Sequence, residues 1–331
     1  HSVATGGRSS QGEDSRMKEL DELVKVREQI IPRAQLKRLA KRNNYAGLGF
    51  LAFHFSLIGA TGWLVHLALG TWWIVPAVFL HGVTLATLFA PLHETSHGTA
   101  FRTVWLNEAV LWLCGLLYIF PPQWFRYHHA FHHTYTQIRR RDSAMVLPKP
   151  ITLGQYLFYV SAVPVWRRNL SYLFNHAMGR LDPAEHEYAP ADQHPALIRE
   201  ARVMVTIYAG IAAVAVAYGS WAPVIYWLLP RIVGESYARW IRVAEHTGCE
   251  EGSDPRANTR TTQTNPFIRI LWWNMPYHAE HHLCAFVPFH ALGKFHEQVH
   301  DKLLVSNGGY FKVHLELFRR FIRLKHGAQA G

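Results

Sequence analysis

The sequence has few charged residues and little cysteine. Only 17% of its 331 residues are Asp, Glu, Lys or Arg, against roughly a quarter in an average soluble domain. This shortage excludes a disordered, collagenous or polar repeat protein. The three cysteines, Cys114, Cys249 and Cys284, show no C-x-x-C spacing, which argues against a disulfide framework and against a rubredoxin-like or zinc-ribbon site. We therefore expect a reducing compartment.

Charged side chains are absent from several long stretches of the chain. Residues 43–93 contain no Asp, Glu, Lys or Arg, and a helix needs only about 20 apolar residues to cross a bilayer. A second charge-free run covers residues 203–230, and shorter ones cover 109–125 and 150–166. The pattern predicts an integral membrane protein.

We expect an all-α membrane fold with four transmembrane helices. The expected elements are crossings at 46–69 and 72–92, buried or interfacial helices at 109–125 and 150–166, a polar loop at 178–200, and two more crossings between 201 and 246. In the last crossing, Arg231, Glu235 and Arg239 are spaced four apart and share one helix face. Charges within a membrane must be paired or face a cavity.

The chain divides into four expected segments. We predict a disordered N-terminus at 1–15, an amphipathic segment at 16–44 broken near Pro32, a membrane domain at 45–300 that carries a metal site, and an amphipathic helix at 301–331. The face of the last helix is expected to carry Phe311, Leu315, Phe318 and Ile322.

Basic residues set the expected orientation. Lys37, Arg38, Lys41 and Arg42 precede the first crossing, which places the N-terminus in the cytoplasm. An even number of crossings then brings the histidine-rich segments into one cytoplasmic cap, on a cell inner membrane or the endoplasmic reticulum. The net charge of +11 is better explained by attraction to anionic lipid than to nucleic acid, because the basic residues flank apolar runs.

Histidine, in contrast, is abundant, with 22 residues. Three clusters are formed by His93 and His97; by His129, His132 and His133; and by His278, His281 and His282. On a helix, positions i, i+3 and i+4 share a face, so each cluster presents its imidazoles to one point. Composition alone predicts only about 0.1 H-x-x-H-H motifs in such a chain, and two are present. Imidazole binds iron, zinc, copper and nickel, so the clusters predict a metal site. His128 breaks the spacing, and we expect a structural role for it more than a ligand role.

The three clusters, in this order and spacing, resemble the histidine boxes of the membrane-bound fatty acid desaturase and hydroxylase superfamily, HxxxH or HxxxxH followed by two HxxHH boxes. The likeness extends over about residues 45–299. It implies two iron ions, O2 as co-substrate, and a site at the cytoplasmic mouth of the membrane helices. A further family ligand follows the last crossing, where this chain has His246. The implied metal ligands are His93, His97, His129, His132, His133, His246, His278, His281 and His282.

One position departs from the family pattern. In the acyl-CoA desaturase branch an asparagine four residues before the extra histidine holds a metal-bound water, whereas this chain has Arg242. Asn274, four residues before His278, is expected either to replace it or to cap a helix. The carboxylates that adjoin expected ligands are candidate catalytic or supporting residues, or ordinary solvated side chains; they are Glu94, Glu245 and Glu280.

The resemblance implies an oxygen-dependent di-iron oxidoreductase that acts on an unactivated C–H bond of a lipid or acyl chain. Reduced iron activates oxygen, while the protein supplies position and excludes water. A fatty acid desaturase is the favoured interpretation. A hydroxylase or monooxygenase of a lipid or small alkyl substrate is the alternative, because both reactions begin with hydrogen abstraction. We expect a separate ferredoxin-like or cytochrome electron donor to dock on the basic face.

A second class of function competes for the first cluster. His93-Glu94-Thr95-Ser96-His97 is also H-E-x-x-H, the zinc metalloprotease motif with glutamate as general base. In a membrane protein this motif predicts an intramembrane zinc metalloprotease. That interpretation leaves the other two clusters unexplained. A metal transporter or storage protein would be expected to place its ligands within the crossings.

Overall fold

The computed structural model describes residues 29–146 and 149–327, and helices dominate it. The expected segment 1–15 and residues 16–28 of the expected segment 16–44 lie outside the described residues. Within the described part, Pro32 precedes α2 (Arg33–Leu39), at the position of the expected break. A short parallel pair joins β1 (Thr261–Thr262) to β2 (Val305–Ser306).

Three helical segments of the described chain are long and apolar enough to span a membrane. They are α3 (Asn44–Ala68), the consecutive helices α4 (Ile74–Ala86) and α5 (Phe89–Ser96), and α10 (His194–Ala217) with the turn before it. The Asn43 side chain accepts a hydrogen bond from the Ala46 N–H at 2.8 Å and so begins α3. Most of α3 and α10 is exposed on the protein surface, as expected for helices that contact lipid.

The fourth crossing differs from the expectation. Helix α11 (Leu229–His246) is not among the apolar spans of the described chain, because charged residues interrupt its apolar run. The other candidate is the pair α6 (Val104–Tyr118) and α7 (Pro122–Tyr135), which meets the test as one broken span bent by 100°. The bend arises because Ile119 takes a φ of 61° and Pro122 begins a new helix.

Three charges on α11, those of Arg231, Glu235 and Arg239, are paired, as predicted. The Arg231 guanidinium lies 2.6 Å from one carboxylate oxygen of Glu235, and the Arg239 guanidinium lies 2.7 Å from the other. All three side chains are buried. On the neighbouring face, a Cβ on Gly234 would lie 1.9 Å from the Gly82 carbonyl oxygen, so α4 and α11 touch backbone to backbone only because both positions are glycine.

Three further expectations need correction. The helix expected at 150–166 is divided into α8 (Leu153–Val160) and α9 (Val163–Ala177), because Ala162 takes a φ of 63°. The loop expected at 178–200 contains two 3-10 turns, and α10 already begins at His194. Pro195 does not prevent this early start, because a proline in the first turn of a helix loses no helical hydrogen bond.

The C-terminal helix α16 (Gly309–Gly327) begins eight residues later than expected, after β2 and Gly308, and both Gly308 and Gly309 have a positive φ. Its buried residues also differ from the expected face. Tyr310, Val313, Leu317 and Phe321 pack into the core, while Phe311, Leu315 and Ile322 are exposed. The reason is that α16 carries apolar residues on two faces, and only one of them contacts the rest of the protein.

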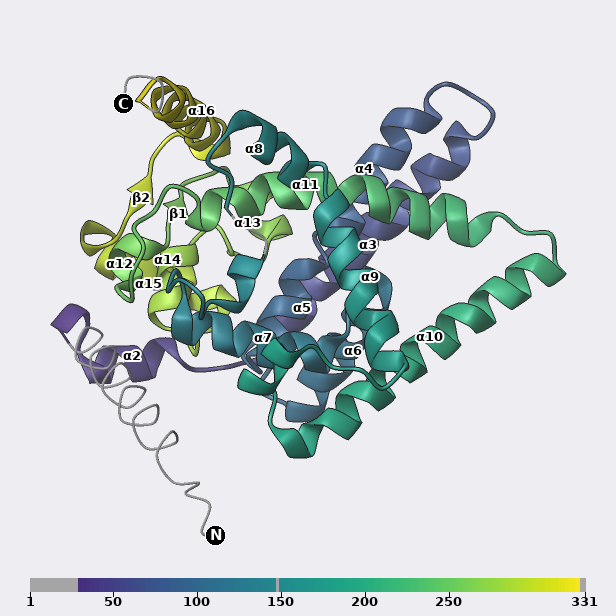
Figure 1. Cartoon of the computed structure of the whole chain (residues 1–331), viewed down its shortest axis with the longest axis horizontal. Coiled ribbons are helices and arrows are strands. Elements are labelled where there is room, and N and C mark those ends of the chain that lie inside the picture. Colours follow the sequence, from purple (N-terminus) through teal and green to yellow (C-terminus); the bar gives the residue numbers. More distant parts are fainter. Residues whose placement is uncertain (1–28, 147–148, 328–331) are drawn as a thin grey trace, which may run out of the picture.

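The remaining elements are short. They are the 3-10 turns Ser143–Val146, Pro183–Glu187, Ala191–Gln193, Phe289–Ala291 and His300–Lys302, the π-helical turn Val224–Leu228, and α12 (Pro255–Asn258), α13 (Pro266–Leu271), α14 (His278–Leu283) and α15 (Leu292–Val299). Figure 1 shows α12, α14, α15 and both strands gathered at one end of the molecule, away from the far end of α10.

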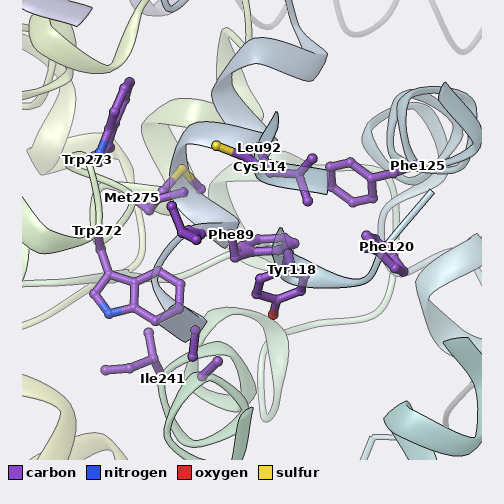
Figure 2. Packing of buried hydrophobic residues seen from close by; sticks show 14 of the residues in the cluster. Phe89, Leu92, Cys114, Tyr118, Phe120, Phe125, Ile241, Trp272, Trp273 and Met275 are labelled. Carbon is purple, nitrogen blue, oxygen red and sulfur yellow. The ribbon is translucent and has the colours of Figure 1, made fainter. Parts of the chain in front are cut away.

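A continuous aromatic core joins this end to the membrane helices. Phe89 packs against Tyr118 with ring centroids 5.7 Å apart. Figure 2 shows this pair at the centre, with Phe125 on one side and Trp272 on the other. These four side chains are almost fully buried. Their packing fixes α5 and α7, which carry two of the histidine clusters, relative to each other.

Candidate metal centre

Helices α5, α7, α11 and α14 bring the nine sequence-predicted histidines together. The first cluster ends α5, the second lies in α7, His246 is the last residue of α11, and the third cluster forms α14. Seven of the nine are buried, and His97 and His133 are half-buried. The i, i+3 and i+4 spacing aims each cluster inward, so side chains far apart in the sequence meet at one place.

The five-histidine group consists of His93, His97, His129, His133 and His281, whose ligand nitrogens all lie within 4.8 Å of one another. Nε2 of His133 lies 3.0 Å from Nε2 of His129 and 3.1 Å from Nε2 of His281. One imidazole nitrogen carries a single proton or lone pair and cannot serve both neighbours. Two ligands about 2.1 Å from one ion at right angles are about 3 Å apart. The spacing therefore fits a shared metal ion better than hydrogen bonds.

The mixed group consists of two overlapping sets that share His246. One set contains His132, His246 and His282, and the other contains Glu245, His246 and His278. Nε2 of His246 lies 3.2 Å from Nε2 of His278, which lies 3.6 Å from Oε2 of Glu245. This group offers four imidazoles and one carboxylate to a second ion.

Hydrogen bonds orient three imidazoles of the mixed group. Nδ1 of His132 donates to Asp142 at 2.7 Å, and Nδ1 of His246 donates to the Asn258 carbonyl oxygen at 3.3 Å. Nδ1 of His282 donates to the Thr136 hydroxyl at 3.1 Å, since that hydroxyl donates its own proton to a backbone carbonyl. A proton on Nδ1 leaves the Nε2 lone pair free for a metal.

The five-histidine group has fewer such contacts. Among the described residues, both ring nitrogens of His93 and the Nδ1 atoms of His133 and His281 have no hydrogen-bond partner. Unpartnered buried nitrogens are costly, and a bound metal ion satisfies the ones that face it.

Protonation states agree with a ligand role. Burial above all, with the neighbouring imidazoles, lowers the pKa of His278, His281 and His282 well below the usual range, so these rings are neutral and offer lone pairs. Burial alone would raise the pKa of Asp142, but His132 and two backbone N–H groups outweigh it and lower the pKa to about 2. Asp142 is therefore an anion that holds the His132 Nδ1 proton.

Two other sequence-predicted residues, Glu94 and Asn274, bind the backbone of Phe289 instead of joining either group. Oε1 of Glu94 accepts hydrogen bonds from the Thr99 hydroxyl at 2.6 Å and from the Phe289 N–H at 3.0 Å. The Asn274 amide donates to the Phe289 carbonyl oxygen at 3.1 Å. Together they hold the segment after α14 against α5.

Glu280, the remaining candidate carboxylate, faces away from the histidine groups. It is fully buried and accepts hydrogen bonds from Thr261 and from Nδ1 of His296. His128 also stays outside both groups, with Nε2 3.2 Å from the Ser143 carbonyl oxygen. These contacts fix the backbone around α14 and α7.

Sequence reasoning missed Asp142, Thr136 and Asn258, which orient ligands from outside. Asp142 offered one available signal, because it is the first acidic residue after the His129–His133 cluster and follows three arginines. Thr136 and Asn258 carry no comparable signal, since polar residues of these types are common in loops.

A cavity of about 90 Å³ lies against both groups. His93 and His129 line it from the five-histidine group, and His132, His246 and His278 line it from the mixed group. Its lining includes the aromatic side chains Phe89, Phe120 and Phe125 and the basic side chains Lys149, Arg168, Arg239 and Arg242. A substrate placed here would touch both metal groups.

The model of the family described as fatty acid desaturase matches residues 70–314. The chain is 24% identical to an sn-1 oleoyl-lipid 12-desaturase of Picosynechococcus sp. over 74% of this chain and 74% of that protein. It is 26% identical to the dihydrorhizobitoxine desaturase of Bradyrhizobium elkanii over 84% of this chain and 80% of that protein. An sn-1 oleoyl-lipid 12-desaturase of Arthrospira platensis is 22% identical, over 70% of this chain and 69% of that protein.

Neither the match nor the geometry supports the intramembrane protease alternative. Its general base would be Glu94, whose Oε1 is engaged by Thr99 and Phe289, and its motif uses two of the nine assembled histidines. The family match covers most of the chain and includes all three histidine clusters. The protein is a membrane oxidoreductase that belongs to the fatty acid desaturase family.

Proposed function

We propose that the protein is an oxygen-dependent di-iron desaturase that removes two hydrogen atoms from adjacent carbons of an acyl or alkyl chain. The observation that carries the proposal is the convergence of nine histidines into two groups beside one cavity, in a chain of the desaturase family. The relatives' names specify two different substrates, an oleoyl lipid and dihydrorhizobitoxine, so the proposal at this level covers the reaction and not the substrate.

The two groups fit two iron ions. The five-histidine group would hold one, and the mixed group, with Glu245, would hold the other. Imidazole-rich donor sets suit iron, and bound iron would supply the activation of oxygen that side chains cannot perform. Overall, one O2, two electrons and two protons convert a –CH2–CH2– segment into –CH=CH– and two waters.

The chain's own residues position the substrate and the ligands. Phe89, Phe120 and Phe125 form the aromatic part of the lining that holds the reacting carbons and excludes water. Asp142 retains the proton on Nδ1 of His132, which keeps the opposite nitrogen directed at the mixed group. Positioning of this kind decides whether two hydrogens leave or one oxygen is inserted.

The electrons come from a separate ferredoxin-like or cytochrome donor on the cytoplasmic face of a cell inner membrane or the endoplasmic reticulum. A recess of about 540 Å³ next to His246 supports a docking place, because Arg139, Arg140 and Arg320 line it. A basic surface favours encounter with an acidic partner.

The proposal is tested with purified protein supplied with oxygen, a reducing system and candidate acyl lipids. We expect two irons per chain and a product lighter by two hydrogens, read by mass spectrometry. His129→Ala and His282→Ala should lose iron and turnover, whereas His186→Ala, an exposed histidine outside both groups, should keep both. Gain of one oxygen would indicate a hydroxylase, and one zinc per chain would contradict the proposal.

A further inference from the structure

The cavity at the metal groups carries positive charge that the described residues do not neutralise. Lys149, Arg168, Arg239 and Arg242 line it, and Glu245 is the one acidic residue in its lining. All four basic side chains are buried or half-buried. An excess of cations in a low-dielectric space is unfavourable unless an anion joins them.

The partners of the three arginines differ. Arg239 is paired with Glu235, which it shares with Arg231. The Arg242 guanidinium lies 3.8 Å from Glu245 and 4.0 Å from the centre of the Phe89 ring. Neither contact neutralises the charge fully, because 3.8 Å is too long for a hydrogen bond.

Arg168 has no ion pair within the described chain, and its Nε atom has no hydrogen-bond partner there. Burial lowers the pKa of Arg168, and the charges of Arg239 and Arg242 lower it further. A third guanidinium beside the other two is electrostatically unfavourable, and a bound anion would remove this unfavourable interaction.

The size of the cavity limits the ligand. Its volume of about 90 Å³ is below the roughly 300–1,000 Å³ of sites for drug-sized ligands, and below the roughly 150 Å³ of an apolar cavity that holds benzene. A long acyl chain does not fit in this space. A short molecule with one anionic end and one apolar segment matches the basic and the aromatic side chains of the lining.

The large apolar groove of the protein does not reach the metals. A space of about 640 Å³ lies between α9, α10 and the π-helical turn, with Phe174, Tyr208 and Trp227 in its lining, and no histidine of either metal group lines it. Lipid lying in this groove would touch the membrane helices without meeting the reactive centre.

Given the proposed desaturase function, we propose that the substrate is a compact carboxylate, namely a short-chain acid. Arg168 and Arg242 bind its carboxylate, and its short apolar segment lies against Phe89 and Phe125, next to both metal groups. The two arginines are the specificity-determining residues of the site.

The test measures binding of neutral and anionic probes of the same shape to the iron-loaded full chain in lipid nanodiscs. Propanoate and butanoate are compared with propanamide and butanamide by isothermal titration calorimetry. We expect each acid to bind about tenfold or more tightly than its amide. Arg168→Gln should weaken acid binding by about the same factor and leave amide binding unchanged, whereas Arg167→Gln, an exposed neighbour outside the cavity, should bind like the unaltered protein.

Arg168→Lys keeps a charge and should keep part of the preference for acids. The unfolding temperature of Arg168→Gln should equal or exceed that of the unaltered protein, since an unpaired buried charge is removed. The inference would be overturned if the acids bound no more tightly than their amides. It would also be overturned if Arg168→Gln bound the acids with the same affinity as the unaltered protein.

Two further measurements separate this inference from the proposed function. If the protein holds iron and desaturates oleoyl phosphatidylcholine at the same rate with Arg168→Gln, the desaturase stands and the compact-carboxylate substrate fails. If acids bind through Arg168 but the protein takes up no iron, the anion site stands and the desaturase fails.

Discussion

The five-histidine group and the mixed group line one cavity but hold their rings by different means. Three imidazoles of the mixed group keep a fixed orientation through Asp142, Thr136 and Asn258. Four rings of the five-histidine group, those of His93, His97, His133 and His281, have ring nitrogens with no such partner in the described chain. The difference indicates that the mixed group is preorganised by the protein, whereas the five-histidine group depends on the metal to hold it together.

The largest expected effect comes from His133. Its Nε2 atom lies next to those of both His129 and His281, so His133→Ala removes the central donor of the five-histidine group. We expect no measurable turnover and one iron per chain or fewer, by elemental analysis. The control is His186→Ala, which should retain two irons. Full iron content and turnover in His133→Ala would contradict the assignment.

The next effect separates the two groups. Asp142→Asn keeps the shape of the side chain but removes the charge that holds the His132 proton. Loss of an outer partner typically weakens metal binding about 10- to 100-fold, so we expect loss of the mixed-group iron alone, seen as one of two Mössbauer components. Asp192→Asn, an exposed aspartate outside the site, should change neither component. Equal loss of both irons would show that the groups do not act separately.

Replacement of Glu245 tests whether the mixed group uses a carboxylate. Glu245→Gln removes the charge 3.6 Å from Nε2 of His278, and we expect about a tenfold loss of affinity for one iron with an altered Mössbauer signal for that ion only. Glu187→Gln, on an exposed turn, is the matched control. An unchanged signal would assign Glu245 to the cavity wall and not to the metal.

The smallest effect is expected for Thr136. Thr136→Val removes the hydroxyl next to Nδ1 of His282 and nearly preserves the volume. One hydrogen bond contributes about 1 kcal/mol, so iron affinity of the mixed group should fall by about fivefold, measured by chelator competition. Thr134→Val, on the exposed side of α7, should leave affinity unchanged. If Thr136→Val lowered the iron affinity of the mixed group more than Asp142→Asn does, the Thr136 contact would matter more than the Asp142 contact, and the proposed order would be wrong.

Local patterns predicted much of the site because they depend on helix geometry alone. The spacing of the three histidine clusters placed their imidazoles on single faces, and the cost of charge in a membrane predicted the pairing of Arg231, Glu235 and Arg239. The bend between α6 and α7 was beyond such reasoning. Pro121 and Pro122 mark a helix break in the sequence, but the size of the bend depends on a positive φ at Ile119, a residue type for which that conformation is uncommon.

The cavity was also beyond prediction. Arg168 and Arg242 lie on different helices, and nothing in their sequence neighbourhoods shows that they meet beside the metal groups. Contacts between distant segments follow from how helices pack, and that packing is a property of the whole fold.

The sequence by itself determined which imidazoles are candidate donors and that each cluster faces one way. Tertiary structure decided which candidate donors lie together: His132 and His133 are neighbours in the chain but enter different groups, as do His281 and His282. Successive residues on a helix point about 100° apart, so adjacent rings face different partners. Which partner each one meets depends on the helices packed opposite, and only the assembled fold brings those helices into place.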